Sequence, residues 1–156
     1  MNNPYEIRFK LQTFSVHDSK DEAGKNYRSG APVSSSESAA VYARGIYAGL
    51  DADKEHFTML ALNNKNRVIG FKVVSTGSLT ASIVHPREVF RAAIFLDAAG
   101  LIVVHNHPSG DPAPSREDID ITKRLKEGAE LLGLRLLDHV ILGDERFFSF
   151  SDKGML

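Results

Sequence analysis

The stretch Leu101-Ile-Val-Val-His-Asn-His-Pro-Ser-Gly-Asp-Pro-Ala-Pro-Ser-Arg-Glu-Asp118 joins a short apolar run to two histidines, a turn-rich loop and a helix start. We predict that residues 101–104 form a buried strand. His105 and His107 then lie at the end of this strand and point to the same side, because strand side chains alternate between the two faces. Their Cα atoms would be roughly 6–7 Å apart.

Asp118 follows on the first turn of the next predicted helix and offers a carboxylate oxygen. Two imidazoles and one carboxylate suit zinc at ~2.0–2.1 Å and leave a fourth position for water, as in catalytic zinc sites. A bound cation would lower the pKa of that water toward ~7 and make it a nucleophile. The sequence therefore predicts a zinc site formed by His105, His107 and Asp118.

Each part of this pattern also has a simpler interpretation. Ser115-x-x-Asp118 is a helix-capping pattern, in which both side chains bond free backbone N–H groups. Two histidines one residue apart can also lie on a strand end without binding a metal. The combination of apolar strand, His-x-His, turn-rich loop and Ser-x-x-Asp favours the metal site.

Taken together, these residues resemble a known motif. His105-Asn-His107, seven residues, Ser115, two residues and Asp118 resemble the JAMM motif of MPN/JAB metalloproteases. The longer strings His85-Pro-Arg-Glu-Val-Phe90 and Leu137-Asp-His139 resemble RadC-type proteins of this superfamily. The resemblance covers about residues 34–156, which we predict to be a RadC-like JAB/MPN domain. It implies an α/β fold, cytidine-deaminase-like, with a mixed sheet sandwiched by helices.

The resemblance also implies roles for individual residues. His105, His107 and Asp118 match the zinc ligands, and Ser115 matches a catalytic serine that donates to the developing oxyanion. The family pattern has an upstream glutamate as general base, and we assign that position to Lys72. A lysine is cationic at neutral pH and therefore a poor base beside a dication. Glu88 is near in sequence, but we predict a helix-dipole role for it.

Three functional hypotheses follow. The first is a zinc-dependent, metallopeptidase-like hydrolase that cleaves peptide or isopeptide bonds with metal-activated water, acting on a protein or peptide substrate. The second is a catalytically impaired binding module, which Lys72 motivates. The third is a DNA-repair-associated factor, which the history of the RadC name motivates.

Composition restricts these hypotheses. The 156 residues carry a net charge of −1, which argues against direct binding to nucleic acid. The chain has no cysteine, which excludes disulfides and zinc sites with thiolate ligands. No apolar run approaches the ~20 residues of a membrane helix, and we see no signal peptide. We therefore expect a cytoplasmic protein with no membrane partner, and the sequence leaves its oligomeric state open.

Outside the motif, the order of predicted elements is a helix, two strands, a short strand, a helix, a strand, a helix and two strands. Residues 1–33 form an N-terminal extension, with a strand over residues 5–12 and a polar loop over residues 17–36. We expect a short strand over residues 79–84 and a helix from Pro86 that ends at Gly100. Relatives often carry a helix-hairpin-helix segment before the JAB domain, and we see no room for it in the extension. For Asp138-His139, a buried stabilising pair and a partner that orients a metal ligand both stay open.

Overall fold

The computed structural model describes residues 19–20, 26–27, 30–77 and 84–156. The strand predicted over residues 5–12, and all but the last residue of the one predicted over residues 79–84, lie outside this part of the chain. The elements are β1 (Ser19–Lys20), β2 (Asn26–Tyr27), α1 (Ser36–Tyr47), β3 (Glu55–Leu62), β4 (Val68–Gly77), α2 (Pro86–Phe95), β5 (Gly100–Asn106), α3 (Arg116–Leu131), β6 (Arg135–Leu142) and β7 (Phe147–Ser149).

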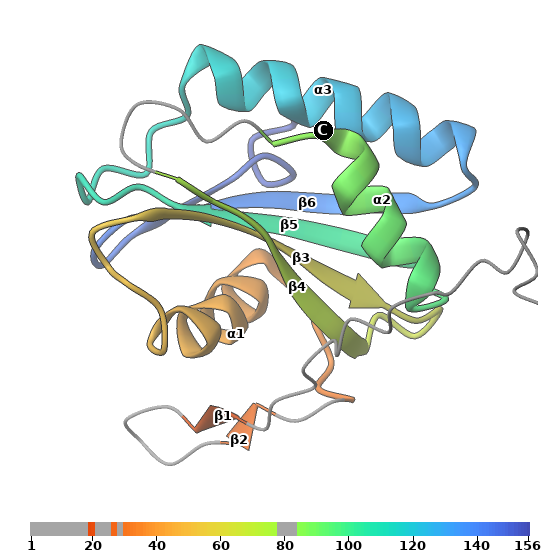
Figure 1. The fold of residues 1–156 in the computed structure, drawn as a ribbon, viewed down its shortest axis with the longest axis horizontal. Helices are drawn as coiled ribbons and strands as arrows, with labels where there is room; N and C mark the ends of the chain where they lie inside the picture. The colour runs from red at the N-terminus through yellow and green to blue at the C-terminus, as the bar shows by residue number, and fades with distance from the viewer. Residues whose placement is uncertain (1–18, 21–25, 28–29, 78–83) are drawn as a thin grey trace, which may run out of the picture.

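Five strands form a mixed sheet in the order β4-β3-β5-β6-β7 (Figure 1). Only the β5–β6 pair is parallel, and α3 is the crossover that joins these two strands. The other neighbours in this sheet are antiparallel. The parallel crossover places the start of α3 next to the end of β5, the central strand, and the predicted ligands lie there.

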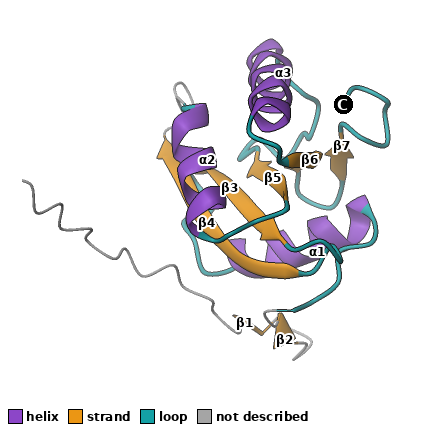
Figure 2. Ribbon diagram, turned by 90° about the vertical axis from the view of Figure 1, so that its right-hand side faces the viewer, coloured by secondary structure: helices purple, strands orange, loops and turns teal. Residues whose placement is uncertain are grey.

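Helices cover both faces of the sheet, as the sequence predicts (Figure 2). One core lies under α1 and contains Ala43 and Ile46 from the helix with Leu60 and Leu62 from β3. The second core lies under α2 and α3. Strand β3 serves both, because its alternate residues Phe57, Met59 and Ala61 point to the α2/α3 side. The sheet is therefore buried on both sides at its centre.

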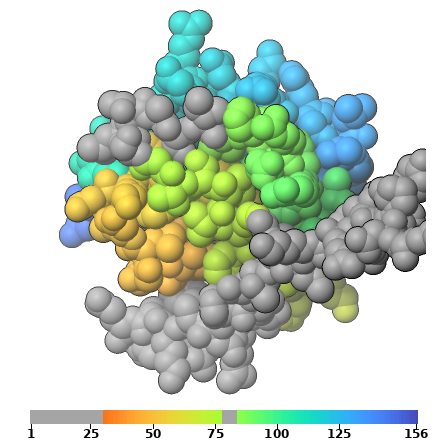
Figure 3. Space-filling model, in the orientation of Figure 1, coloured from red at the N-terminus to blue at the C-terminus, as the bar shows by residue number. Residues whose placement is uncertain are grey.

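The part of the surface seen in Figure 3 shows the edge strand β4 beside α2, with α3 above them. Helix α2 starts at Pro86, as predicted, but it ends at Phe95 and not at Gly100. Asp97 leaves the helical path with φ 51°, a conformation that Asp tolerates better than most residues. Gly100 instead begins β5, where an added Cβ would lie 3.2 Å from the Arg135 carbonyl oxygen.

Two smaller features complete the fold. The loop predicted over residues 17–36 contains the two-residue strands β1 and β2, which pair antiparallel with each other. Among the described residues, no helix is both long and apolar enough to cross a lipid bilayer.

Candidate metal centre

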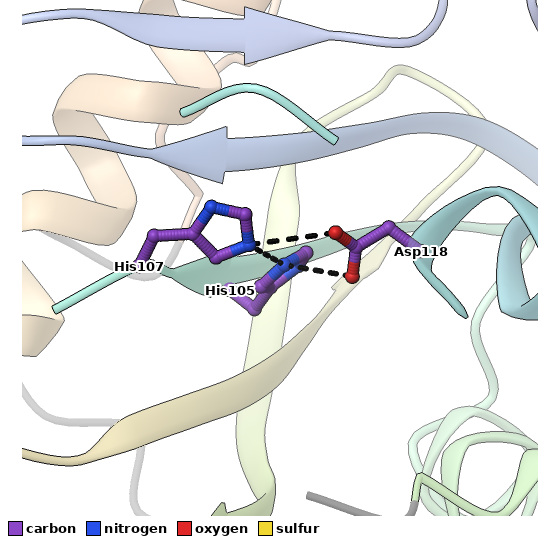
Figure 4. Close-up of side chains that lie close together, drawn as sticks. All are labelled: His105, His107 and Asp118. Atoms are coloured by element: carbon purple, nitrogen blue, oxygen red, sulfur yellow. Dashed lines mark hydrogen bonds and ion pairs between the residues drawn. The ribbon is translucent and has the colours of Figure 1, made fainter. Parts of the chain in front are cut away.

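The side chains of His105, His107 and Asp118 meet at one point beside the start of α3 (Figure 4). His105 Nε2 lies 3.0 Å from His107 Nε2 and 3.1 Å from Asp118 Oδ1. His107 Nε2 lies 3.4 Å from Asp118 Oδ2. Two ligands on a tetrahedral zinc with bonds of ~2.0–2.1 Å are about 3.3–3.4 Å apart. The three side chains thus form a group that fits a single metal ion.

Strand β5 fixes the position of His105. This residue pairs with Phe57 of β3 on one side and with Ile141 of β6 on the other, and its side chain is fully buried. Its ring stacks on Phe57 with the centroids 5.7 Å apart. The sheet and this stacking contact hold the imidazole in one orientation.

The loop after β5 fixes His107. Its Nδ1 lies 2.8 Å from the backbone carbonyl oxygen of Asp111. A carbonyl oxygen can only accept, so the neutral ring carries its hydrogen on Nδ1 and keeps the lone pair on Nε2. That lone pair points at His105 and Asp118. The loop therefore prepares His107 to bind a metal through Nε2.

Backbone contacts attach this loop to the turn between β6 and β7. The His107 N–H donates to the Leu142 carbonyl, and the Asp144 N–H donates to the Gly110 carbonyl. Gly110 has φ +82°, and an added Cβ there would collide with the carboxylate of Asp144. Gly143 is equally restricted, because its Cβ would collide with the Gly110 carbonyl oxygen. Both glycines are needed for the loop to lie this close to the turn.

Asp118 caps α3 and also faces the two histidines. The Ser115 N–H donates to Asp118 Oδ2 at 2.7 Å, and the Asp118 N–H donates to Ser115 Oγ at 3.1 Å, so the capping box is present. The same carboxylate also faces both histidines. The cap thus orients the carboxylate toward the histidines, and the capping and ligand interpretations are compatible.

Electrostatics couple the three residues. Burial alone would raise the pKa of Asp118, but hydrogen bonds from His105 and His107 outweigh it and hold this pKa far below its ordinary range. The hydrogen bond to Asp118 raises the pKa of His107, against the effect of burial. The negative charge of Glu55 adds a smaller increase. A carboxylate that stays ionised is the form that binds a cation.

Glu55 is a candidate residue that we did not single out from the sequence. Phe57 of β3 pairs antiparallel with His105 of β5, so the next positions on the same face are Glu55 and His107. The effect of Glu55 on the pKa of His107 agrees with this placement. Glu55 is partly exposed as the first residue of β3. The sequence did indicate a hairpin over residues 56–75 and a strand that leads into His-x-His. It did not give the register of these strands, which is what places Glu55 on the face of His107.

Lys72, to which we assigned the base position, lies elsewhere. It pairs with Met59, which in turn pairs with Val103, two residues before His105. Lys72 therefore lies on the same face of the sheet as the triad, but further from the strand ends where the triad lies. A β-bulge between the Phe57 and Thr58 pairings also separates Lys72 from the residues that pair with His105. Glu88 forms an ion pair of 2.7 Å with Arg91 on the first turns of α2, which agrees with a structural role.

Asp138 and His139 do not bond to each other through their side chains. The Asp138 carboxylate accepts the backbone N–H groups of His139 and Ser151 and the hydroxyl of Ser149. The His139 ring instead lies against His105, with its Nε2 2.8 Å from His105 Nδ1. Burial lowers the pKa of His139 well below its ordinary value, so the ring is neutral.

A pocket of about 890 Å³ opens on the α1 side of the triad. Its wall includes Tyr47, His56, Asn106 and the metal-site residue His107. A molecule bound there would lie beside the candidate metal centre.

Comparison with known proteins gives the family. The family model of the RadC-like JAB domain matches residues 33–155. A UPF0758 protein of Geobacillus thermodenitrificans is 61% identical over 101 residues, covering 65% of this chain and 45% of the relative. A UPF0758 protein of Geobacter sulfurreducens is 55% identical over 116 residues, covering 74% of this chain and 51% of the relative.

The chain spans about half the length of the curated relatives that it matches. The matched region contains α1 to α3, the five-stranded sheet and the triad. With its mixed sheet between helices and its His-His-Asp group at the end of β5, this chain belongs to the RadC-like JAB domain family.

Proposed function

We propose that the chain is a zinc-dependent hydrolase that cleaves amide bonds of the peptide or isopeptide type. The observation that carries the proposal is the convergence of His105 Nε2, His107 Nε2 and a capped Asp118 carboxylate at the spacing of zinc ligands. The site lies where β5 ends and α3 begins. His105 and Asp118 are buried, but Ser115 is exposed and the His107 side chain is 17% exposed. Substrate can therefore approach it.

Zinc is the metal that we propose. Three ligands of the nitrogen and oxygen type with room for a fourth are typical of catalytic zinc. When bound, the ion would polarise a carbonyl oxygen and lower the pKa of a water molecule toward ~7. The remaining chemistry must come from side chains near the triad.

Glu55 is the residue that we assign as general base. It is the first residue of β3, and continuing the β3–β5 register from Phe57 and His105 places it opposite His107, on the same face as the triad. A carboxylate in this place can take a proton from the attacking water and pass it to the leaving amine, a role that typically contributes 10²–10⁴-fold to the rate. This assignment removes the main reason for regarding the domain as catalytically impaired, because that reason rested on Lys72.

Ser115 is the residue that we assign to the oxyanion. Its Oγ accepts the Asp118 N–H, and its own hydroxyl hydrogen has no acceptor among the described residues. Ser115 is an exposed residue, and its hydroxyl lies next to Asp118. It is therefore free to donate to an oxygen that becomes negative as the carbonyl is attacked.

The pocket beside His107 is where we place the part of the substrate next to the cleaved bond. Its wall reaches the metal site only through His107 and its neighbours Asn106 and Pro108. A part of the substrate bound there would contact His107, and positioning of this kind is itself a source of catalysis.

The test starts with metal analysis of the full chain, purified without added zinc. We expect zinc in the wild type and its loss in His107→Ala. The wild type is then assayed on a panel of peptide, isopeptide and simple amide substrates with and without a chelator. Cleavage that the chelator stops and zinc restores would support the proposal. Zinc binding without cleavage of any substrate would favour the binding module and contradict the hydrolase.

The hypothesis of a DNA-repair-associated factor has a separate test. A gel shift at several salt concentrations would detect phosphate contacts, since their affinity falls steeply with salt. Within the part of the chain that the structure describes, we find no feature that favours this hypothesis over hydrolysis.

A further inference from the structure

His139 lies at the centre of a chain of hydrogen bonds that joins two of the three metal-site residues. Its Nε2 is 2.8 Å from Nδ1 of His105, and its Nδ1 is 2.5 Å from Oγ1 of Thr122. The Thr122 hydroxyl lies 2.5 Å from the backbone carbonyl oxygen of Asp118. The series of hydrogen bonds therefore starts at the His105 ring and ends at the backbone carbonyl of Asp118.

The direction of each bond follows from the chemistry at both ends. A carbonyl oxygen can only accept, so Thr122 donates its single hydrogen to Asp118. His139 must then donate its Nδ1–H to Thr122, which leaves a lone pair on its Nε2 to accept from His105 Nδ1–H. A neutral His105 with its hydrogen on Nδ1 has a lone pair on Nε2, the atom that faces His107 and Asp118.

The same assignment follows independently from the metal end. A metal ion on His105 Nε2 requires that neutral His105 carry its hydrogen on Nδ1. That hydrogen points to His139, which must accept it. Both ends therefore require the same tautomer of His139. If His139 Nε2 donated to His105 Nδ1 instead, neutral His105 would carry its hydrogen on Nε2, the metal-binding nitrogen.

Packing holds the His139 ring in place for this role. The side chain is fully buried, lies parallel to Phe150 with the centroids 4.8 Å apart, and meets Phe57 edge-on. Phe57 also stacks on His105. Two aromatic rings thus fix both imidazoles, and the ring nitrogens of His139 have no other partner among the described residues.

We propose that His139 is a positioning residue that selects the metal-binding tautomer of His105 and, through Thr122, ties it to the backbone of Asp118. The inference rests on the metal centre of the proposed function, but it does not depend on hydrolysis. Removing such outer partners typically weakens metal affinity by 10–100-fold.

The first test is the zinc affinity of matched variants of the full chain. His139→Phe keeps the aromatic packing but removes the acceptor, and we expect it to bind zinc about 10–100-fold more weakly. His139→Gln restores an acceptor for His105 and should recover most of this loss. Thr122→Val should weaken zinc binding less than His139→Phe does, and Thr122→Ser should bind zinc as the wild type does. Zinc affinities equal to the wild type in both His139→Phe and Thr122→Val would overturn the inference.

The second test does not need a variant, so it holds even if His139→Phe does not fold. Long-range proton–nitrogen NMR of the zinc-loaded wild type reports which nitrogen of each imidazole carries the hydrogen. We expect Nδ1–H on both His105 and His139. A hydrogen on Nε2 of His139 would overturn the inference. Neither test measures cleavage. A protein that binds zinc but cleaves nothing would therefore refute the hydrolase and leave this inference standing. A wild type that binds no zinc would overturn both.

Discussion

His56 and His105 are buried histidines on opposite faces of the sheet, and they differ in how their ring nitrogens are satisfied. His56 on β3 faces α1 and is 4% exposed, whereas His105 on β5 faces α3 and is fully buried. His56 Nε2 donates to the Asp51 carbonyl at 2.7 Å, and its Nδ1 lies 3.0 Å from the Thr76 hydroxyl. Both ring nitrogens of His56 thus have a neutral hydrogen-bond partner.

His105 has such a partner on one nitrogen only. Its Nε2 faces the Nε2 of another imidazole and a carboxylate, and two nitrogen lone pairs pointing at each other are satisfied only by a proton or a metal ion between them. Burial alone therefore does not separate a structural histidine from a ligand. The difference lies in what remains unsatisfied after the fold has supplied its hydrogen bonds.

The largest expected effect is the loss of zinc when a ligand is removed. His107→Ala should lower zinc affinity by more than the 10–100-fold typical of an outer partner, because a direct ligand is lost. His56→Ala, the control on the other face, should leave zinc affinity unchanged. Isothermal titration or competition with a chromophoric chelator measures both. If the two variants lost zinc equally, the contrast between the two faces would be refuted.

The next effect concerns catalysis at an unchanged metal site. Glu55→Gln should bind zinc as the wild type does but hydrolyse substrate about 10²–10⁴-fold more slowly, because the variant lacks the proposed general base. Lys72→Met is the comparison for the position that we assigned from the sequence, and it should retain turnover. The measurement is kcat on the substrate found in the panel, with zinc content determined in parallel. Full activity in Glu55→Gln would rule out its assignment as the base.

A smaller effect is expected on the stability of the fold. His56→Phe removes two hydrogen bonds of the ring, one to the Asp51 carbonyl, which keeps the Lys54 N–H, and one to the exposed Thr76 hydroxyl. At about 0.5–1.5 kcal/mol for each bond, the loss should cost about 1–3 kcal/mol of unfolding free energy. Zinc affinity should not change, because His56 makes no contact with the triad that the structure shows. Denaturant unfolding in the presence of a chelator measures the cost. A stability equal to the wild type would mean that these hydrogen bonds contribute nothing net.

The smallest effect is a pH dependence confined to the metal side. In the metal-free protein the pKa of His107 is raised above its ordinary 6.5, so its stabilising contribution is complete below that value and is lost as pH rises through the raised pKa. The pKa of Asp118 is lowered, so its contribution is complete above its ordinary 3.8 and is lost only in strong acid.

Thermal melts between pH 6 and 8 test this difference. The melting temperature of the chelator-treated protein should fall by a few degrees as pH rises, whereas zinc should stabilise the protein more at higher pH because metal and proton compete for His107. His107→Ala should remove the pH dependence of the chelator-treated form. A metal-free melting temperature that rose with pH would contradict the raised pKa of His107.

Much of the site could be predicted because its signals are local. Alternation along one strand places His105 and His107 on one side, and a capping pattern places Asp118 at a helix start. Both depend on backbone geometry within a few residues, so the sequence carries them directly. The same holds for the order of the helices and strands along the chain.

Residues that reach the site from distant segments could not be predicted from local patterns. Glu55 precedes His107 by about fifty residues, and only the register of β3 against β5 places it beside the triad. A β-bulge in the β3–β4 pairing shifts Lys72 relative to Phe57, the residue that pairs with His105, and nothing in the sequence indicates the bulge. His139 reaches His105 only through the parallel pairing of β5 with β6.

The sequence by itself determined the family, the mixed α/β fold and the three residues that could hold a metal, since these depend on short patterns and local periodicity. The tertiary structure alone decided that Glu55 shares a face with the triad. It also decided that both ring nitrogens of His56 have neutral hydrogen-bond partners, whereas Nε2 of His105 faces another imidazole and a carboxylate. The physical reason is that strand register and the direction of hydrogen bonds are set by contacts across the sheet, which no local pattern encodes.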